Sequence, residues 1–129
     1  MKSLHKAALG VAAGRVAFGL YALADPARPA RSWLGSHADA TTANLFGRTL
    51  GARDLGLGAG AVWALATRPG DRELLAALVA AGALADSVDA AATFAAWSNL
   101  STPWKQITAG LALGSAVTGG VVAGLIAAG

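Results

Sequence analysis

Four apolar blocks, each about as long as a membrane-spanning helix, make up most of the chain and limit the folds it can adopt. They cover about 4–24, 44–66, 74–97 and 104–128, and the segments between them are rich in charges, proline and glycine. Crossing about 30 Å of hydrocarbon takes roughly 20 residues of α-helix. The pattern predicts an all-α fold, a four-helix transmembrane bundle, with residues 1–129 forming a single integral membrane domain.

The composition favours a membrane protein over a soluble one. Of the 129 residues, 55% are hydrophobic and 13% are charged, whereas a typical soluble domain has about 25% charged residues. The 17 glycines and many alanines supply the small side chains that let membrane helices approach each other closely.

Two alternatives to this fold are less consistent with the sequence, and a possible internal repeat is compatible with it. A soluble alanine-rich bundle is disfavoured because the segment from Ile107 to Gly129 has no charged residue and so lacks a water-facing side. A cleaved secretory signal at the N-terminus is disfavoured by Arg15, which lies in its apolar middle. A pseudo-repeat of "YALADPARP" and "WALATRPG" would suggest two related hairpins, although alanine-rich helices produce such matches by chance.

The same sequence argues against nucleic-acid binding and enzyme chemistry. The net charge is +3, but the basic residues are scattered singly or in pairs, so no phosphate-tracking surface is expected. The chain has no cysteine, which excludes disulfides and thiolate metal sites, and His5 and His37 lie on flanking segments. We therefore expect no catalytic residue, metal site, cofactor or nucleic-acid partner.

The block ends predict how the chain sits in the lipid bilayer, its expected partner. Tryptophans suit the headgroup level, and all four lie near block ends: Trp33, Trp63, Trp97 and Trp104. With four spans, the termini share a side with the loop after the second block. That side has one more basic residue than the other, with Lys2, Lys6, Arg68 and Arg72 against Arg28, Arg31 and Lys105. The bias favours a cell-membrane protein with both termini in the cytoplasm.

Five charged residues lie near the middle of the first three blocks, about 15 Å from either membrane surface by helix rise: Arg15, Arg53, Asp54, Asp86 and Asp89. An unpaired charge there costs about 2.5 to 3.5 kcal/mol, so pairing is expected, with Arg53 or Arg15 reaching Asp86 and Asp89. Arg48 lies nearer its block's start and reaches the interface by its long side chain. Counting Arg48, the set holds three cations and three anions and is formally neutral.

Helical spacing predicts which faces carry these residues. On the second block, Gly47, Gly51, Asp54 and Gly58 share one face, which would let another helix pack closely. On the third block, Gly82, Asp86, Asp89 and Thr93 form one small, polar stripe. Arg53 is about 100° from Asp54 around the helix and is expected to face a different neighbour.

Two functions remain open for this set of charges. The first is a small membrane protein that acts through association, as a homo-oligomer or an accessory subunit of a membrane complex, with the charges fixing helix register. The alternative is a small transporter or proton- or ion-conducting protein that uses the Asp/Arg cluster as its site, because intramembrane ionisable residues are functional candidates. A glycine groove on the fourth block would favour a partner helix. It consists of Gly110, Gly114, Gly120 and Gly124.

The segments "GRTLGARDLGLGAG" and "LADSVDAAATF" resemble a family of small bacterial integral membrane proteins with four predicted spans, catalogued as a domain of unknown function. Its members have a Gly-x-Arg-Asp motif followed by glycine on the second span, matched here by Gly51, Arg53, Asp54 and Gly58. They also have an aspartate on the third span, which corresponds to Asp86 or Asp89. The resemblance implies a four-helix membrane bundle and brings no activity, substrate or catalytic residue.

Overall fold

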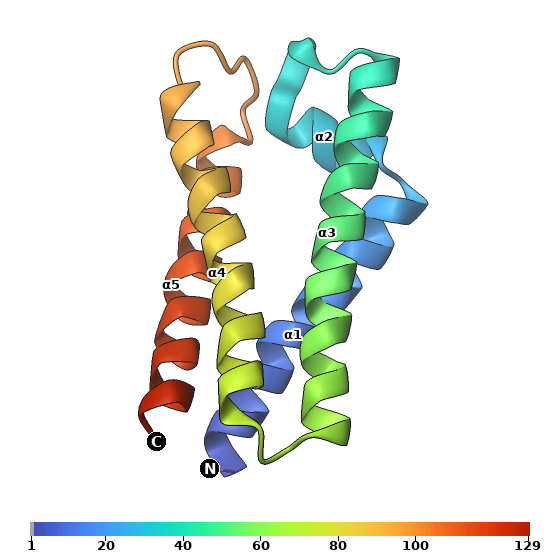
Figure 1. Ribbon diagram of the computed structural model, residues 1–129. Helices are drawn as coiled ribbons and strands as arrows, with labels where there is room; N and C mark the ends of the chain where they lie inside the picture. Colours follow the sequence, from blue (N-terminus) through green and yellow to red (C-terminus); the bar gives the residue numbers. More distant parts are fainter. Residues whose placement is uncertain (1) are drawn as a thin grey trace.

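The computed structural model describes residues 2–129, and over that range the chain is helical without strands (Figure 1). The elements in chain order are α1 (Lys2–Ala24), α2 (Ala27–Leu34), the 3-10 helix η1 (Gly35–His37), α3 (Ala40–Thr67), α4 (Arg72–Ala95) and α5 (Lys105–Ala128). The predicted all-α fold is confirmed. The four long helices α1, α3, α4 and α5 cover the four apolar blocks.

The long helices are arranged as two antiparallel pairs (Figure 1). α1 packs along α3, and α4 packs along α5, whereas α1 touches α4 and α5 only slightly. Both termini and the α3–α4 loop lie at one end, and α2, η1 and the segment 96–104 lie at the other. We call these the terminal end and the α2 end.

Three of the helices, α1, α4 and α5, are long and apolar enough to cross a membrane by length and composition. α3 is the longest helix, at 28 residues, but it falls outside this set. It carries Arg48, Arg53 and Asp54, and these charges lower its mean hydropathy. The membrane character of the chain therefore rests on three helices, and that of α3 depends on what its charges contact.

The segment that follows the first block is not a plain loop, as its prolines had suggested. α1 does end before Pro26, but the chain then forms α2, with Pro26 at its N-cap and Pro29 in its first turn. Proline is tolerated there because the first N–H groups of a helix have no intrahelical acceptor. Pro103 lies in the turn before α5, and Trp104 is the N-cap of that helix.

The α2 end is tied together by short-range polar contacts. The Thr102 hydroxyl donates to the Ser32 carbonyl at 3.0 Å, and the hydroxyls of Ser36 and Ser101 lie 2.6 Å apart. Between them the chain turns at Gly35, whose φ of 61° favours glycine. These contacts connect α2, which belongs to the first helix pair, to the loop that joins α4 and α5.

Close packing of α1 on α3 depends on glycine. A Cβ added to Gly51 would lie 2.9 Å from the Gly19 carbonyl oxygen, and one added to Gly58 would lie 2.7 Å from that of Ala12. At Gly47, an added Cβ would collide with the Pro26 carbonyl. The glycine face of the second block therefore lies against α1, as small-residue faces do in membrane helix pairs.

Two apolar clusters close the molecule at its ends. The cluster at the terminal end joins α1, α4 and α5, and consists of Ala8, Leu75, Ala76, Val79, Val122, Ala123 and Ile126. The cluster at the α2 end consists of Ala30, Ala38 and Ala43, with Ala27, Leu34 and Phe46 packed against it. The five charged residues at the middle of the long helices lie between these two clusters.

Candidate functional site

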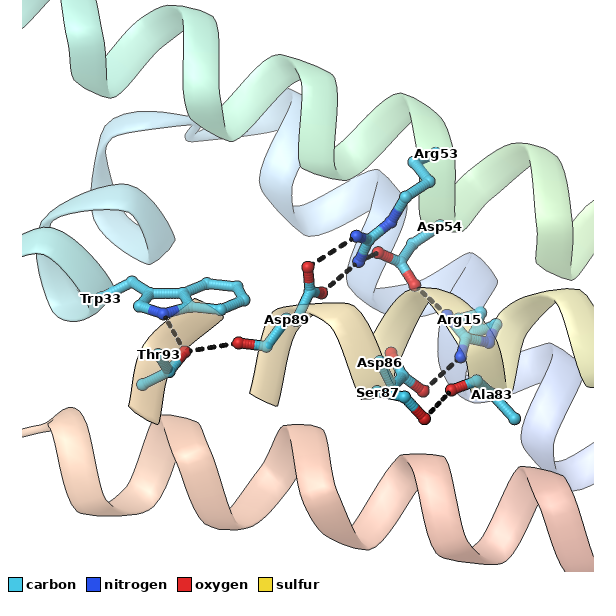
Figure 2. A network of polar contacts seen from close by, with 9 residues as sticks. All are labelled: Arg15, Trp33, Arg53, Asp54, Ala83, Asp86, Ser87, Asp89 and Thr93. Carbon is cyan, nitrogen blue, oxygen red and sulfur yellow. Dashed lines mark hydrogen bonds and ion pairs between the residues drawn. The ribbon is translucent and has the colours of Figure 1, made fainter. Parts of the chain in front are cut away.

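The five mid-helix charges come together into one group, which we call the Arg/Asp network: Arg15, Arg53, Asp54, Asp86 and Asp89 (Figure 2). Arg15 of α1 donates through Nη1 to Asp54 of α3 and through Nη2 to Asp86 of α4. A single guanidinium therefore bridges both helix pairs.

Arg53 of α3 forms a bidentate ion pair with Asp89 of α4. Its Nη1 lies 3.0 Å from Asp89 Oδ1, and its Nη2 lies 2.7 Å from Asp89 Oδ2. The same Nη2 also donates to Asp54 Oδ2 at 2.9 Å. Arg53 thus faces α4, as expected, but it also binds its own neighbour Asp54, because the long side chain curls back along α3. Asp54 is held by both arginines.

Glycine makes room for this arrangement on α4. A Cβ added to Gly82 would lie 2.6 Å from Nε of Arg15 and 2.8 Å from its Cζ. On the opposite side, a Cβ at Gly58 would lie 2.9 Å from the Arg15 Cβ. Arg15 is therefore enclosed between two glycines of different helices, and its guanidinium occupies the space that a side chain at Gly82 would fill.

The centre of the network is buried, while Arg53 and Asp89 are half-buried, and the network carries an excess of negative charge. Asp54 and Asp86 are 5% and 7% exposed, and the Arg15 side chain is 11% exposed. With two arginines and three aspartates, the formal charge is −1. The sequence-based count of zero included Arg48, which lies exposed elsewhere on α3 and is not one of the contacts above.

The hydrogen-bonding groups of the network are nearly all used. Both carboxylate oxygens of Asp54 and of Asp89 accept from arginine. Asp86 accepts through Oδ2 alone, and within residues 2–129 no donor lies at its Oδ1. One buried donor, Nε of Arg53, has no acceptor in that range. Asp86 is therefore the aspartate of this negatively charged network that keeps a carboxylate oxygen without a donor within residues 2–129.

Trp33 is connected to the Arg/Asp network by a chain of hydrogen bonds that runs towards the α2 end (Figure 2). Its Nε1 donates to the Thr93 hydroxyl at 2.9 Å, and that hydroxyl donates to the Asp89 carbonyl at 2.7 Å. The indole also packs edge-on against Phe46, with ring centroids 5.4 Å apart. Trp33 was expected to rest among lipid headgroups, but it is an internal contact between α2, α3 and α4. The sequence did not predict this internal contact, because Trp33 lies in a proline-containing segment between two apolar blocks.

A cavity of about 740 Å³ lies beside the network, between the two helix pairs, and we call it the cleft. All five network residues line it. Its other walls are largely apolar and come from α1, α2 and α5. These walls include Gly10, Val11, Gly14, Phe18, Tyr21, Trp33, Trp104, Ile107, Leu111 and Gly114, together with four hydroxyl side chains, Ser32, Thr108, Ser115 and Thr118.

The cleft opens between α1 and α5. Its exposed lining residues all belong to these two helices or to Trp104, which directly precedes α5, whereas the lining residues of α3 and α4 are buried or half-buried. Towards the terminal end, the lining stops at Gly10, about half a helical turn from Ala8 of the apolar cluster, and at Thr118, about one turn from Val122 of that cluster. The cleft is therefore closed towards the terminal end.

A second cavity of about 400 Å³ adjoins the cleft at the α2 end. It is lined by Asp25, Ala27, Arg28, Arg31, Ser32 and Trp104, and shares Ser32 and Trp104 with the cleft. Its charged lining is net positive, with two arginines and one aspartate. The network is thus approached through the opening between α1 and α5 on one side and through a basic pocket at one end.

These features define a class: an all-helical chain with three helices suited to spanning a membrane and a buried Arg/Asp network that faces a cleft. Compared with protein-family models, curated proteins and solved structures, the chain matches none. The resemblance to a family of small bacterial membrane proteins therefore stays a prediction. Within residues 2–129, no group of three or more side chains is arranged to hold a metal ion.

Proposed function

We propose that this protein is a small four-span membrane protein that carries a proton, an ion or a charged substrate, and that the cleft-facing Arg/Asp network is its site. The observation that carries the proposal is the cleft itself. A network that only fixes helix register is best sealed, because water or ligand at a buried charge weakens its pairing. Here every network residue borders a cavity, and one acidic oxygen has no donor.

The fourth span in this proposal is α3. Its two central charges are paired, Arg53 with Asp89 and Asp54 with both arginines, which reduces the cost of placing them at mid-membrane depth. Its glycine face also packs directly on α1. Four spans agree with termini that share one end (Figure 1), and the excess of basic residues there supports a cytoplasmic location for both.

Transport needs access from a surface, and the two cavities supply it from one direction. The cleft continues into the basic pocket at the α2 end and is closed towards the termini by an apolar cluster. This asymmetry supports a site that opens towards one side of the membrane at a time, as in transporters that bind near the bilayer midplane.

The test is flux in liposomes that contain the purified protein. We expect uptake of at least one of three species, protons, sodium or a radiolabelled organic cation, to exceed that of protein-free liposomes when a membrane potential is imposed. Asp86→Asn is expected to abolish the excess. Glu73→Gln removes the same charge at an exposed position in the first turn of α4 and is expected to leave the flux intact.

Two outcomes would contradict the proposal. Parent protein that is folded but passes no more ions than protein-free liposomes would overturn transport. Flux that survives Asp86→Asn would overturn the site. Circular dichroism on the reconstituted variants keeps loss of flux apart from loss of fold.

A second function, association with another chain or a second copy, is favoured by one observation on α5. Cβ atoms added to Gly120 and Gly124 would meet nothing within 4 Å, so this small-residue face is open to another helix. The expected result is a dimer or larger complex by light scattering in detergent, which Gly124→Leu disrupts. If the parent protein is monomeric at all accessible concentrations, association of the chain with a second copy of itself is ruled out.

A further inference from the structure

We propose that the ligand of the cleft is a lipophilic organic cation with a single positive charge, whose apolar body fills the cleft and whose charge lies at Asp86. The inference rests on the proposed function, because it names the substrate class for the same site. It is carried by four properties of the cleft: its volume, its aromatic lining, its charge and its openings.

The volume fits a small organic molecule. At about 740 Å³, the cleft falls within the range of about 300 to 1,000 Å³ that is usual for small-molecule sites. Its walls are mainly aliphatic and glycine residues of α1 and α5, with Val11, Ile107 and Leu111 among them. A bare inorganic ion would leave most of this apolar space unfilled.

Four aromatic residues line the part of the cleft nearest the α2 end: Phe18, Tyr21, Trp33 and Trp104. Phe18 and Tyr21 lie one turn apart on α1 with ring centroids 6.2 Å apart. Aromatic faces attract organic cations through the ring quadrupole and pack against apolar groups at the same time. An anion gains nothing from these faces, so the lining selects for positive charge.

The network supplies the complementary charge. Its formal charge of −1 calls for one positive charge, and Asp86 Oδ1 is the carboxylate oxygen of the network that accepts from neither arginine. A monocation beside Asp86 would bring the buried group to neutrality without breaking the Arg53 fork on Asp89. A dication would leave an uncompensated positive charge in a buried place.

The two openings of the cleft favour lipophilic cations over hydrated ones. The pocket at the α2 end carries Arg28 and Arg31, and Asp25 there is already paired with Arg28 at 3.5 Å. This net positive mouth repels hydrated cations that approach from water. The opening between α1 and α5 faces lipid in a membrane-spanning chain, so a cation that partitions into the bilayer reaches Asp86 without passing the arginines.

Equilibrium dialysis of the full-length protein in detergent tests this assignment. The probes are tetraphenylphosphonium and tetraphenylborate, which have the same shape and opposite charge. We expect saturable binding of one tetraphenylphosphonium per chain and no saturable binding of tetraphenylborate. Asp86→Asn is expected to weaken tetraphenylphosphonium binding about tenfold or more, since it removes the charged acceptor. Glu73→Gln is the matched charge control and is expected to bind like the parent.

A second variant tests the cleft without touching the charges. Gly114 lines the cleft, and a Cβ added there meets nothing within 4 Å, so Gly114→Phe fills the space while the Arg/Asp network stays in place. It is expected to lose tetraphenylphosphonium binding. Gly56→Phe adds the same ring on α3 outside the cleft lining, where an added Cβ also meets nothing within 4 Å, and is expected to bind normally.

The outcomes separate the inference from the proposed function. Equal binding of the two probes, or tetraphenylphosphonium binding that survives both Asp86→Asn and Gly114→Phe, overturns the organic-cation assignment. Asp86-dependent ion flux without tetraphenylphosphonium binding also overturns it and leaves the transport function standing. Tetraphenylphosphonium binding that depends on Asp86, with no flux of any tested ion or of the probe, overturns transport and supports the binding site.

Discussion

Arg15 of α1 lies against Gly82 of α4 so closely that a methyl group on Gly82 would sit 2.6 Å from the arginine Nε. The end of an arginine side chain is normally free to move aside. Here it is not, because Arg15 is bound on both sides, to Asp54 and to Asp86. The two residues therefore act as a matched pair, and the network depends on the absence of a side chain at position 82.

Gly82→Ala is expected to destabilise the protein by about 1 to 3 kcal/mol, because Arg15 must release at least one buried carboxylate. Gly120→Ala is the matched control, since nothing lies within 4 Å of a Cβ there. It is expected to be neutral or to stabilise by up to about 1 kcal/mol through helix propensity. Thermal unfolding in detergent measures both. Equal unfolding temperatures would show that Arg15 is not held as described.

Arg53→Lys is expected to cost about 1 to 3 kcal/mol although it keeps the charge. Lysine has one ammonium group and cannot reproduce the fork on Asp89 together with the bond to Asp54. Arg48→Lys makes the same change at an exposed position of α3 and is expected to be neutral within about 0.5 kcal/mol. Chemical or thermal unfolding of both variants beside the parent decides the point.

The cap of α3 predicts a dependence of stability on pH. The Thr42 N–H donates to the Asp39 carboxylate at 2.8 Å and holds the pKa of Asp39 below its usual range. The unfolded chain lacks this bond, so the cap stabilises the fold fully above the usual carboxyl pKa of about 3.9 and loses its effect as pH falls through the lowered folded value.

Asp39→Asn isolates this effect, because a neutral amide caps a helix without titrating. The parent is expected to lose more thermal stability than Asp39→Asn between about pH 5 and pH 2. The difference between their melting temperatures, measured by circular dichroism, is the relevant quantity. A constant difference across that range would contradict the assignment.

The orientation in the membrane can be tested cleanly because the chain has no cysteine. Ser3→Cys and Ser98→Cys place single thiols at exposed positions near the terminal end and the α2 end. In intact bacterial cells, an impermeant maleimide is expected to label Ser98→Cys, and to label Ser3→Cys only after permeabilisation. The reverse pattern would invert the orientation, and labelling of both in intact cells would contradict an even number of spans.

Much of the helical layout was predictable because one signal dominates it. Uninterrupted apolar blocks of membrane length gave α1, α3, α4 and α5 nearly to their ends, and glycine and proline marked the breaks. The short α2 was missed because its two prolines suggest a loop, while their positions at the N-cap and first turn are compatible with a helix.

The membership of the network was predictable, but its pairing was not. The five residues lie at about equal depth, and the cost of an unpaired charge at that depth favours contact among them. They are Arg15, Arg53, Asp54, Asp86 and Asp89. Which arginine meets which aspartate depends on helix rotation and on where glycine leaves room. Gly82 admits Arg15 beside Asp86, and no periodicity in the sequence shows that. Arg48 was counted as a balancing charge because sequence spacing does not reveal its outward direction.

The ion pair between Arg15 and Asp86 also links the two helix pairs. It joins α1 of one helix pair to α4 of the other beside the cleft, close to the Arg53–Asp89 contact that joins α3 to α4. A cation bound at Asp86, as proposed above, would share that carboxylate with Arg15 and so weaken one contact between the two helix pairs. The carboxylate proposed to bind the ligand thus also helps to hold the two pairs together.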